Sequence, residues 1–140
     1  MKLTKKQKKL NKKLRHMQTK SYAEEQIRKE INRNLAQWKL DVREQAGNKC
    51  EVEGCKAEGV FHPHHILVKE RYKEFKTEIK NGVLLCPSHH KYGKFSAHRN
   101  SIWFVKWLQG KYPEKYQWAL ENIGEEKHEE FSDGGLPIIE

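Results

Sequence analysis

The chain has 140 residues, the size of one ordinary domain, and we expect a single core with appended segments. It carries 28 Lys and Arg against 19 Asp and Glu, for a formal net charge of +9, and its mean hydropathy of -1.01 is strongly polar. No stretch approaches the roughly 18 apolar residues of a membrane span. No apolar segment follows the charged start, as it would in a secretory signal. These features exclude a large multidomain enzyme and a membrane-spanning protein, and we expect a cytoplasmic one.

The positive charge is concentrated at the N-terminus. Residues 1–20 contain nine Lys and Arg and no acid, whereas residues 21–140 contain nineteen residues of each sign. We expect residues 1–20 to form a basic arm that is disordered or marginally helical and becomes ordered on a partner. Such an arm attracts a polyanion, usually nucleic acid, by releasing condensed counterions; a solubilising tail is the alternative.

Residues 21–47 predict an amphipathic helix. Ser21 and Glu24 have the spacing of a capping box, and Gly47 supplies a stop. Apolar residues recur between them at spacings of three and four: Ile27, Ile31, Leu35, Trp38 and Val42. The stripe has about three heptads and is interrupted by Asn34, so we favour packing on the following domain over a coiled-coil seam.

Residues 48–98 predict the core. Short strands and turns are expected over 48–68 and a charged connector over 69–80. Asn81-Gly82 introduces a short buried strand, and Pro87 is typical of the first position of a helix, here expected over 87–95.

Residues 99–124 predict two C-terminal helices. The first is capped by Asn100 or Ser101 and closed by Gly110, and the second opens at Pro113 and closes at Gly124. We expect their aromatic residues mainly in the core, with a base-stacking platform as the alternative. Residues 125–140, with six acids, are expected to form a flexible acidic tail.

Six of the eight histidines and all three cysteines lie between residues 50 and 98. An odd number of cysteines argues against a disulfide framework. Cys50, Cys55, Cys86 and His89 make a set of four ligands typical of a structural zinc knuckle, although the C-x4-C step is wider than usual. A metal would stabilise a segment that has few large apolar residues. Buried or free thiols are the alternative.

The remaining histidines need another explanation. On a helix starting at Pro87, His89 and His90 point about 100° apart, so His90 can face away from the zinc. On a strand, His64 and His65 project to opposite sides, so one can hold a metal while the other holds a water.

The stretches GVFHPHHI (59–66) and NGVLLCPSHH (81–90) resemble the HNH endonucleases, part of the His-Me finger or ββα-metal group. The similarity extends over residues 38–98, and the layout is similar to that of small bacteriophage members. It implies an α+β fold with a ββα-metal core and a structural zinc knuckle, flanked by a long N-terminal helix and C-terminal helices. It also implies hydrolysis of DNA that leaves 5′-phosphate and 3′-hydroxyl ends.

The resemblance assigns roles residue by residue. It implies that His65 is the general base and that Asn81 holds the loop or the base imidazole in position. It makes His64, where the family often has aspartate, and His90 the ligands of a catalytic divalent ion, expected to be Mg²⁺, Mn²⁺, Ni²⁺ or Zn²⁺. His89 replaces the more frequent fourth cysteine of the zinc knuckle.

Four residues are candidate contacts to the DNA backbone: Lys91, Lys94, Arg99 and His98. For His98, capping or packing of the next helix is the alternative, and His62 either touches a phosphate or has no role. DNA is the expected partner, together with phage packaging or recombination proteins in a bacterial or phage-infected cytoplasm. The rival functions are a noncatalytic zinc-stabilised nucleic-acid-binding module and a phage structural adaptor.

Overall fold

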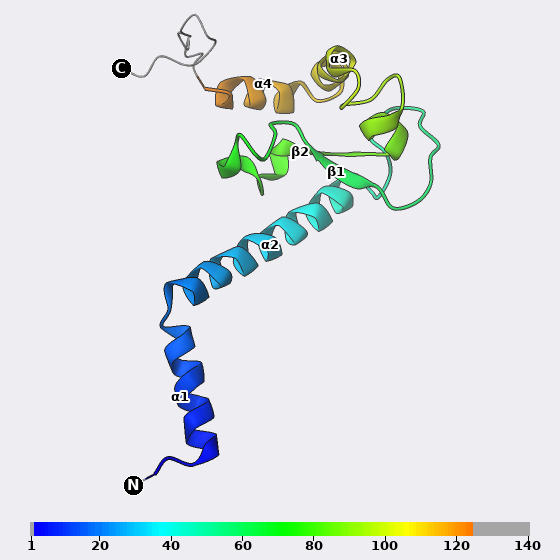
Figure 1. Cartoon of the computed structure of the whole chain (residues 1–140). Coiled ribbons are helices and arrows are strands. Elements are labelled where there is room, and N and C mark those ends of the chain that lie inside the picture. Colours follow the sequence, from blue (N-terminus) through cyan, green and yellow to red (C-terminus); the bar gives the residue numbers. More distant parts are fainter. Residues whose placement is uncertain (1, 125–140) are drawn as a thin grey trace, which may run out of the picture.

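The computed structural model describes residues 2–124, so the acidic tail expected over 125–140 lies outside the described residues. The chain is a mixture of helices and one small antiparallel sheet, which confirms the α+β class (Figure 1). In chain order the elements are α1 (Lys5–Met17), α2 (Lys20–Gln45), β1 (His62–His65), η1 (Lys73–Phe75), η2 (Ile79–Asn81), β2 (Gly82–Leu85), η3 (Ser88–Tyr92), α3 (Ser101–Lys111) and α4 (Pro113–Asn122). Among the described residues, no helix combines the length and apolar character needed to cross a membrane.

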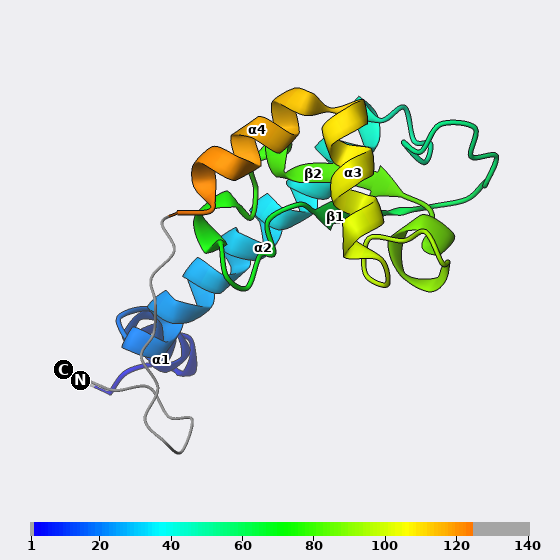
Figure 2. The ribbon, with the colours of Figure 1, turned by 90° about the horizontal axis from the view of Figure 1, so that it is seen from above.

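The two-stranded sheet lies at the centre of the folded core. In Figure 1 the C-terminal half of α2 passes below the sheet and α3 and α4 lie above it, and Figure 2 shows the same layers from above. The buried cluster includes Trp38 and Val42 of α2, Val83, Leu84 and Leu85 of β2, and Phe104 and Leu108 of α3. The Lys115 ammonium of α4 donates a hydrogen bond of 2.8 Å to the Gly82 carbonyl, which ties α4 to the sheet.

Helix α2 packs on the core over only part of its length. Trp38 and Val42 are buried, but Ile27 and Ile31 on the same stripe are 58% and 40% exposed. The expectation that the whole stripe packs on the domain was therefore wrong for its N-terminal half. The reason is length: 26 residues of helix span about 39 Å, whereas a four-residue strand spans about 13 Å.

The basic arm is helical in the structure. Helix α1 starts with a capping box in which Thr4 and Gln7 bond each other's backbone amides, and none of its residues is buried. It projects with the N-terminal half of α2 away from the core (Figures 1 and 2). Thr19 caps α2 through the Tyr22 amide, so the capping box expected at Ser21 was wrong.

The first position of β2 requires a glycine. His62 pairs with Leu85 and His65 pairs with Gly82. A Cβ atom built on Gly82 would lie 2.5 Å from Val42 Cγ2 and 2.8 Å from Trp38 Cζ2. The missing side chain therefore lets α2 approach the start of β2.

The segment after β2 differs from the expected helix over 87–95. It is a single π-helical turn, η3, after which the chain runs irregularly to Asn100. The Asn100 side chain then caps α3 by accepting a 3.0 Å hydrogen bond from the Trp103 amide. Helix α3 continues through Gly110, which therefore does not close it, and Pro113 opens α4 as expected.

Candidate functional site

Three cysteines and one histidine meet at one point of the core. The donor atoms of Cys50, Cys55, Cys86 and His89 all lie within 4.8 Å of one another. Cys55 Sγ lies 3.8 Å from Cys86 Sγ, and His89 Nδ1 lies 3.6 Å from Cys50 Sγ and 3.2 Å from Cys86 Sγ. Tetrahedral zinc places two sulfurs about 3.8 Å apart and a sulfur and a nitrogen about 3.6 Å apart. The cluster could therefore hold a metal ion such as zinc.

Two segments supply these ligands. After α2, Gly47 and Asn48 adopt positive φ angles of 65° and 58°, which reverses the chain toward Cys50. The Glu51 amide donates a 2.9 Å hydrogen bond to the Leu84 carbonyl and so fixes this loop beside β2. Cys86 directly follows β2 and His89 lies on η3, which brings the second pair of ligands to the first.

The chemistry of the cluster also favours a cation. Burial raises the pKa of the Cys50 thiol to about 12, and backbone hydrogen bonds from Cys86 and Val52 only partly offset this effect. Burial lowers the pKa of His89. Thiolates at such a site need a compensating positive charge, which a bound metal ion supplies.

Three other histidines form a second cluster. The donor nitrogens of His64, His90 and His98 lie within 4.8 Å of one another, and His90 Nε2 and His98 Nε2 are 3.1 Å apart. Metal–nitrogen bonds of about 2.0–2.1 Å place neighbouring ligand nitrogens about 3.0–3.4 Å apart. The cluster therefore has the donor type and spacing of a metal site.

Backbone hydrogen bonds bring His98 to this cluster. The π-helical turn directs His89 to the cysteines and His90 to His64. The Ala97 amide then donates to the His89 carbonyl at 2.8 Å, and the His98 amide donates to the His90 carbonyl at 3.0 Å. His98 was expected to contact DNA or to pack on the next helix, and sequence reasoning missed its place beside the two proposed ligands.

Two histidines of the second cluster, His64 and His90, have lowered pKa values. Burial, with the neighbouring His90 and His98, lowers the pKa of His64 to about 3. Burial, His98 and Lys91 lower the pKa of His90 to about 4. Neutral imidazole is the form that binds a metal ion, so these two side chains need lose no proton at neutral pH.

His65 projects from β1 to the other side of the strand. Its ring stacks on Trp38 with the centroids 4.0 Å apart and the planes 10° apart. Its Nε2 lies 2.9 Å from the Lys76 carbonyl oxygen. Because a carbonyl oxygen can only accept, Nε2 carries the hydrogen, and Nδ1 of the neutral ring keeps its lone pair. Burial lowers the pKa of His65, and the bond to Lys76 partly offsets that effect.

Asn81 is fully buried and is a member of neither cluster. Its Oδ1 accepts a 2.6 Å hydrogen bond from the Leu67 amide, and its Nδ2 donates to the carbonyls of Leu67 and Phe75 at 3.0 and 3.1 Å. Of the two implied roles, it therefore holds the loop rather than the imidazole. The loop in turn carries the Lys76 carbonyl that contacts His65.

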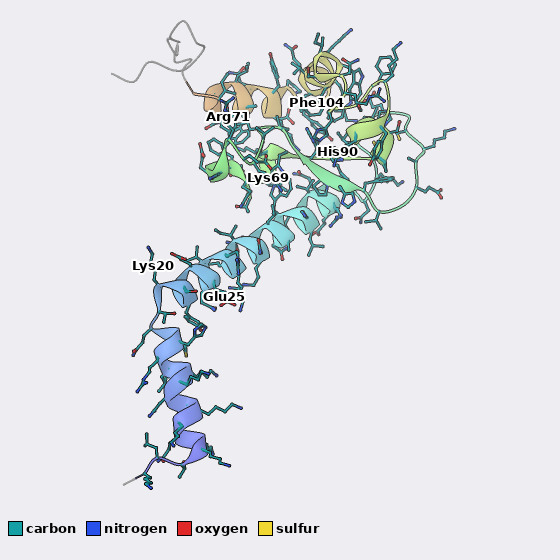
Figure 3. All side chains as sticks on the ribbon, in the orientation of Figure 1. Lys20, Glu25, Lys69, Arg71, His90 and Phe104 are labelled. Atoms are coloured by element: carbon teal, nitrogen blue, oxygen red, sulfur yellow. The ribbon has the colours of Figure 1, made fainter. Side chains whose placement is uncertain are left out.

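His64, His65, His90 and His98 share one surface cleft of about 290 Å³. Lys69, Glu70 and Lys91 also line it. Figure 3 shows Lys69 and His90 on the folded core rather than on the projecting helices.

Two of the four expected DNA contacts, Lys94 and Arg99, are not among the residues that line this cleft. Lys94 places its Nζ 5.7 Å from the ring centroid of Phe95. The Arg99 guanidinium donates to the Tyr92 carbonyl at 2.9 Å. His62 is exposed at the start of β1 and belongs to neither cluster.

Comparisons with known proteins give no relative. No protein-family model, curated protein or solved structure matches this chain.

Proposed function

We propose that the protein is a metal-dependent endonuclease of the HNH type that hydrolyses phosphodiester bonds in DNA. The observation that carries this proposal is the cleft that is lined both by an oriented imidazole, His65, and by the cluster of three histidines. A nuclease needs a base for the attacking water and positive charge at the phosphate, and this cleft offers a candidate for each.

The three-histidine cluster fits a catalytic ion. His64, His90 and His98 would hold it, and three protein ligands leave coordination positions open for substrate. When bound there, a divalent ion supplies the positive charge that stabilises the phosphorane-like transition state and the leaving 3′ oxygen. A donor set of imidazoles favours Ni²⁺ or Zn²⁺ over Mg²⁺, which prefers oxygen ligands.

His65 is the proposed general base. Its Nε2–H is held by the Lys76 carbonyl, so Nδ1 is the atom that accepts a proton from water. Its lowered pKa leaves it unprotonated, and so able to act as a base, at neutral pH. The stack on Trp38 restricts rotation of the ring and keeps Nδ1 in one direction.

Asn81 is a positioning residue in this proposal rather than a catalytic one. It holds Leu67 and Phe75 on the two ends of the loop that carries Lys76. Lys69 and Lys91 at the cleft wall are suited to bind phosphate, because both are exposed and positively charged. Helix α1, with seven Lys and Arg and no acid, adds non-specific affinity for the DNA backbone.

Nicking of a supercoiled plasmid tests the proposal. The zinc-loaded protein is assayed with Ni²⁺, Zn²⁺, Mn²⁺ and Mg²⁺ in parallel, and wild type is compared with His65→Ala. His62→Ala is the matched control, because His62 lies on the same strand outside both clusters. We expect nicking by wild type and His62→Ala and its loss in His65→Ala. Wild type no more active than His65→Ala would defeat the proposal.

A noncatalytic zinc-stabilised nucleic-acid-binding module is the second candidate. The projecting basic helix α1 favours it, because this feature requires only binding. Metal stoichiometry separates the two functions. The nuclease holds one tight zinc and one exchangeable ion per chain, whereas the binding module holds the zinc alone.

A further inference from the structure

A row of aromatic rings lies along the outside of the core. The ring centroids of Phe95 and Trp103 are 6.3 Å apart, and those of Trp103 and Trp107 are 6.1 Å apart with the planes 19° apart. Phe95 is 53% exposed, and both tryptophans are partly exposed. Phe104 and Leu108 fill the buried face of α3, so this aromatic row occupies the edge of the helix that also meets solvent.

The row borders a groove that is larger than the histidine cleft. This groove has a volume of about 480 Å³, and Trp103, Trp107, Lys106 and Lys111 line it. Val52 and Glu53 also line it.

Lysines accompany the aromatic rings along the row. Lys94 lies over the Phe95 ring at 5.7 Å, Lys106 follows Trp103 on α3, and Lys111 pairs with Glu53 at 3.3 Å. The 35 residues from 79 to 113 contain six Lys and Arg and no acid. The positive charge suits a polyanion, and the exposed aromatic rings suit flat apolar groups.

We propose that the aromatic row binds a single-stranded segment of DNA by stacking its bases on Phe95, Trp103 and Trp107. Positive charge interleaved with aromatic rings is the combination that binds single strands without reading their sequence. The rings are spaced at about twice the 3.4 Å rise per nucleotide of a duplex strand. A strand that stacks one base on each ring must therefore be stretched beyond the spacing of duplex DNA. A strand that stays paired in a duplex does not reach this spacing.

The position of the row connects it with the cleft. The His89 ring lies 5.9 Å from Trp103 with the planes 21° apart, and His90 of the three-histidine cluster is the next residue along the chain. A strand that leaves the cleft can therefore continue along α3. Where this inference names the substrate, it rests on the proposed nuclease function: the substrate is duplex DNA that carries a single-stranded extension.

Equilibrium binding tests the row without cleavage. The probe is a fluorescent 20-nucleotide oligo(dT), and every protein carries His65→Ala in the otherwise full chain. Phe95→Ala should raise the Kd for oligo(dT) about fivefold or more. Lys106→Gln should reduce the slope of log Kd against log salt by about 0.7. The controls are Ile102→Ala, which removes an 83% exposed apolar side chain of the same helix, and Lys73→Gln on η1; both should change the Kd less than twofold.

Tryptophan fluorescence gives a second readout. Stacked bases should quench the emission of Trp103 and Trp107 but not that of Trp38, which is 2% exposed. The double variant Trp103→Phe, Trp107→Phe keeps an aromatic ring at both positions, so it should fold and still bind oligo(dT) while losing most of the quenching. Equal quenching in the double variant and its parent would overturn the stacking.

Two further results would overturn the proposal. One is an unchanged oligo(dT) Kd in both Phe95→Ala and Lys106→Gln. The other is an equal loss of affinity for a blunt 20-base-pair duplex, which would remove the preference for single strands. Plasmid nicking tests the nuclease function separately. If that function is wrong, the wild type nicks no faster than His65→Ala, whatever the oligo(dT) Kd values are.

Discussion

Replacing Asn81 with alanine removes the three hydrogen bonds that hold the loop between β1 and β2. Their lengths are 2.6, 3.0 and 3.1 Å, and the residue has no exposed surface, so water cannot replace them without opening the core. Each such bond contributes about 1 kcal/mol net. We therefore expect Asn81→Ala to lower the free energy of unfolding by about 3 kcal/mol, a large part of the roughly 5–15 kcal/mol typical of a domain.

Urea denaturation followed by circular dichroism measures this change. The midpoint should fall with an unchanged m value. Asn34→Ala is the matched control, because Asn34 is exposed on α2 and its replacement should change the stability by less than about 0.5 kcal/mol.

The same variant tests the link to His65. Asn81→Ala should reduce nicking at temperatures where it is folded, because the Lys76 carbonyl is no longer held against the imidazole. A free energy of unfolding within about 1 kcal/mol of wild type would refute the reasoning about the hydrogen bonds. Wild-type nicking by the folded variant would refute the positioning role.

Three other perturbations test separate parts of the structure. Cys86→Ala removes one ligand of the cysteine cluster and should lower the melting temperature sharply. The reason is that zinc binding contributes about 10–16 kcal/mol to the folding free energy of zinc-finger peptides. Equal melting temperatures of variant and wild type would show that no ion is held there. Gly82→Ala should lower the free energy of unfolding, measured by urea titration, by about 1–3 kcal/mol, because its Cβ would lie 2.5 Å from Val42 Cγ2. Val42→Ala should relieve part of this loss in a double-mutant cycle. Strictly additive effects of the two substitutions would contradict the clash. Deleting residues 2–18 removes eight Lys and Arg and keeps the Thr19 cap of α2. The slope of log K for duplex DNA against log salt should fall by about 0.9 for each phosphate that the arm neutralises. An unchanged slope would refute a role for the arm.

Much of the fold could be predicted from local patterns. The spacing of Leu35, Trp38 and Val42 identifies the face of α2 that packs on the core, since burial follows the helical period. Pro113 marks the start of α4 because its missing amide hydrogen is tolerated there. The four zinc-type ligands could be chosen by residue type and spacing.

The parts that could not be predicted depend on contacts between distant backbone groups. The carbonyl of Lys76 orients His65, and a carbonyl is present in every residue and leaves no trace in the sequence. His98 reaches the cluster because two amides bond to the carbonyls of η3, a turn too short to show a period. The clash that requires Gly82 involves α2, about forty residues earlier in the chain. The exposed half of α2 shows the same apolar period as its buried half, so the pattern alone could not locate the end of the packing.

The most direct test of the central claim is to measure ion binding and cleavage together in His65→Ala. Zinc-loaded wild type and variant are titrated calorimetrically with Ni²⁺ and then assayed for plasmid nicking with the same ion. If His64, His90 and His98 hold the ion and His65 accepts the proton, the variant binds the second ion with wild-type affinity and cleaves at least about 100-fold more slowly. A variant that cleaves at the wild-type rate, or that no longer binds the ion, would contradict this division of roles.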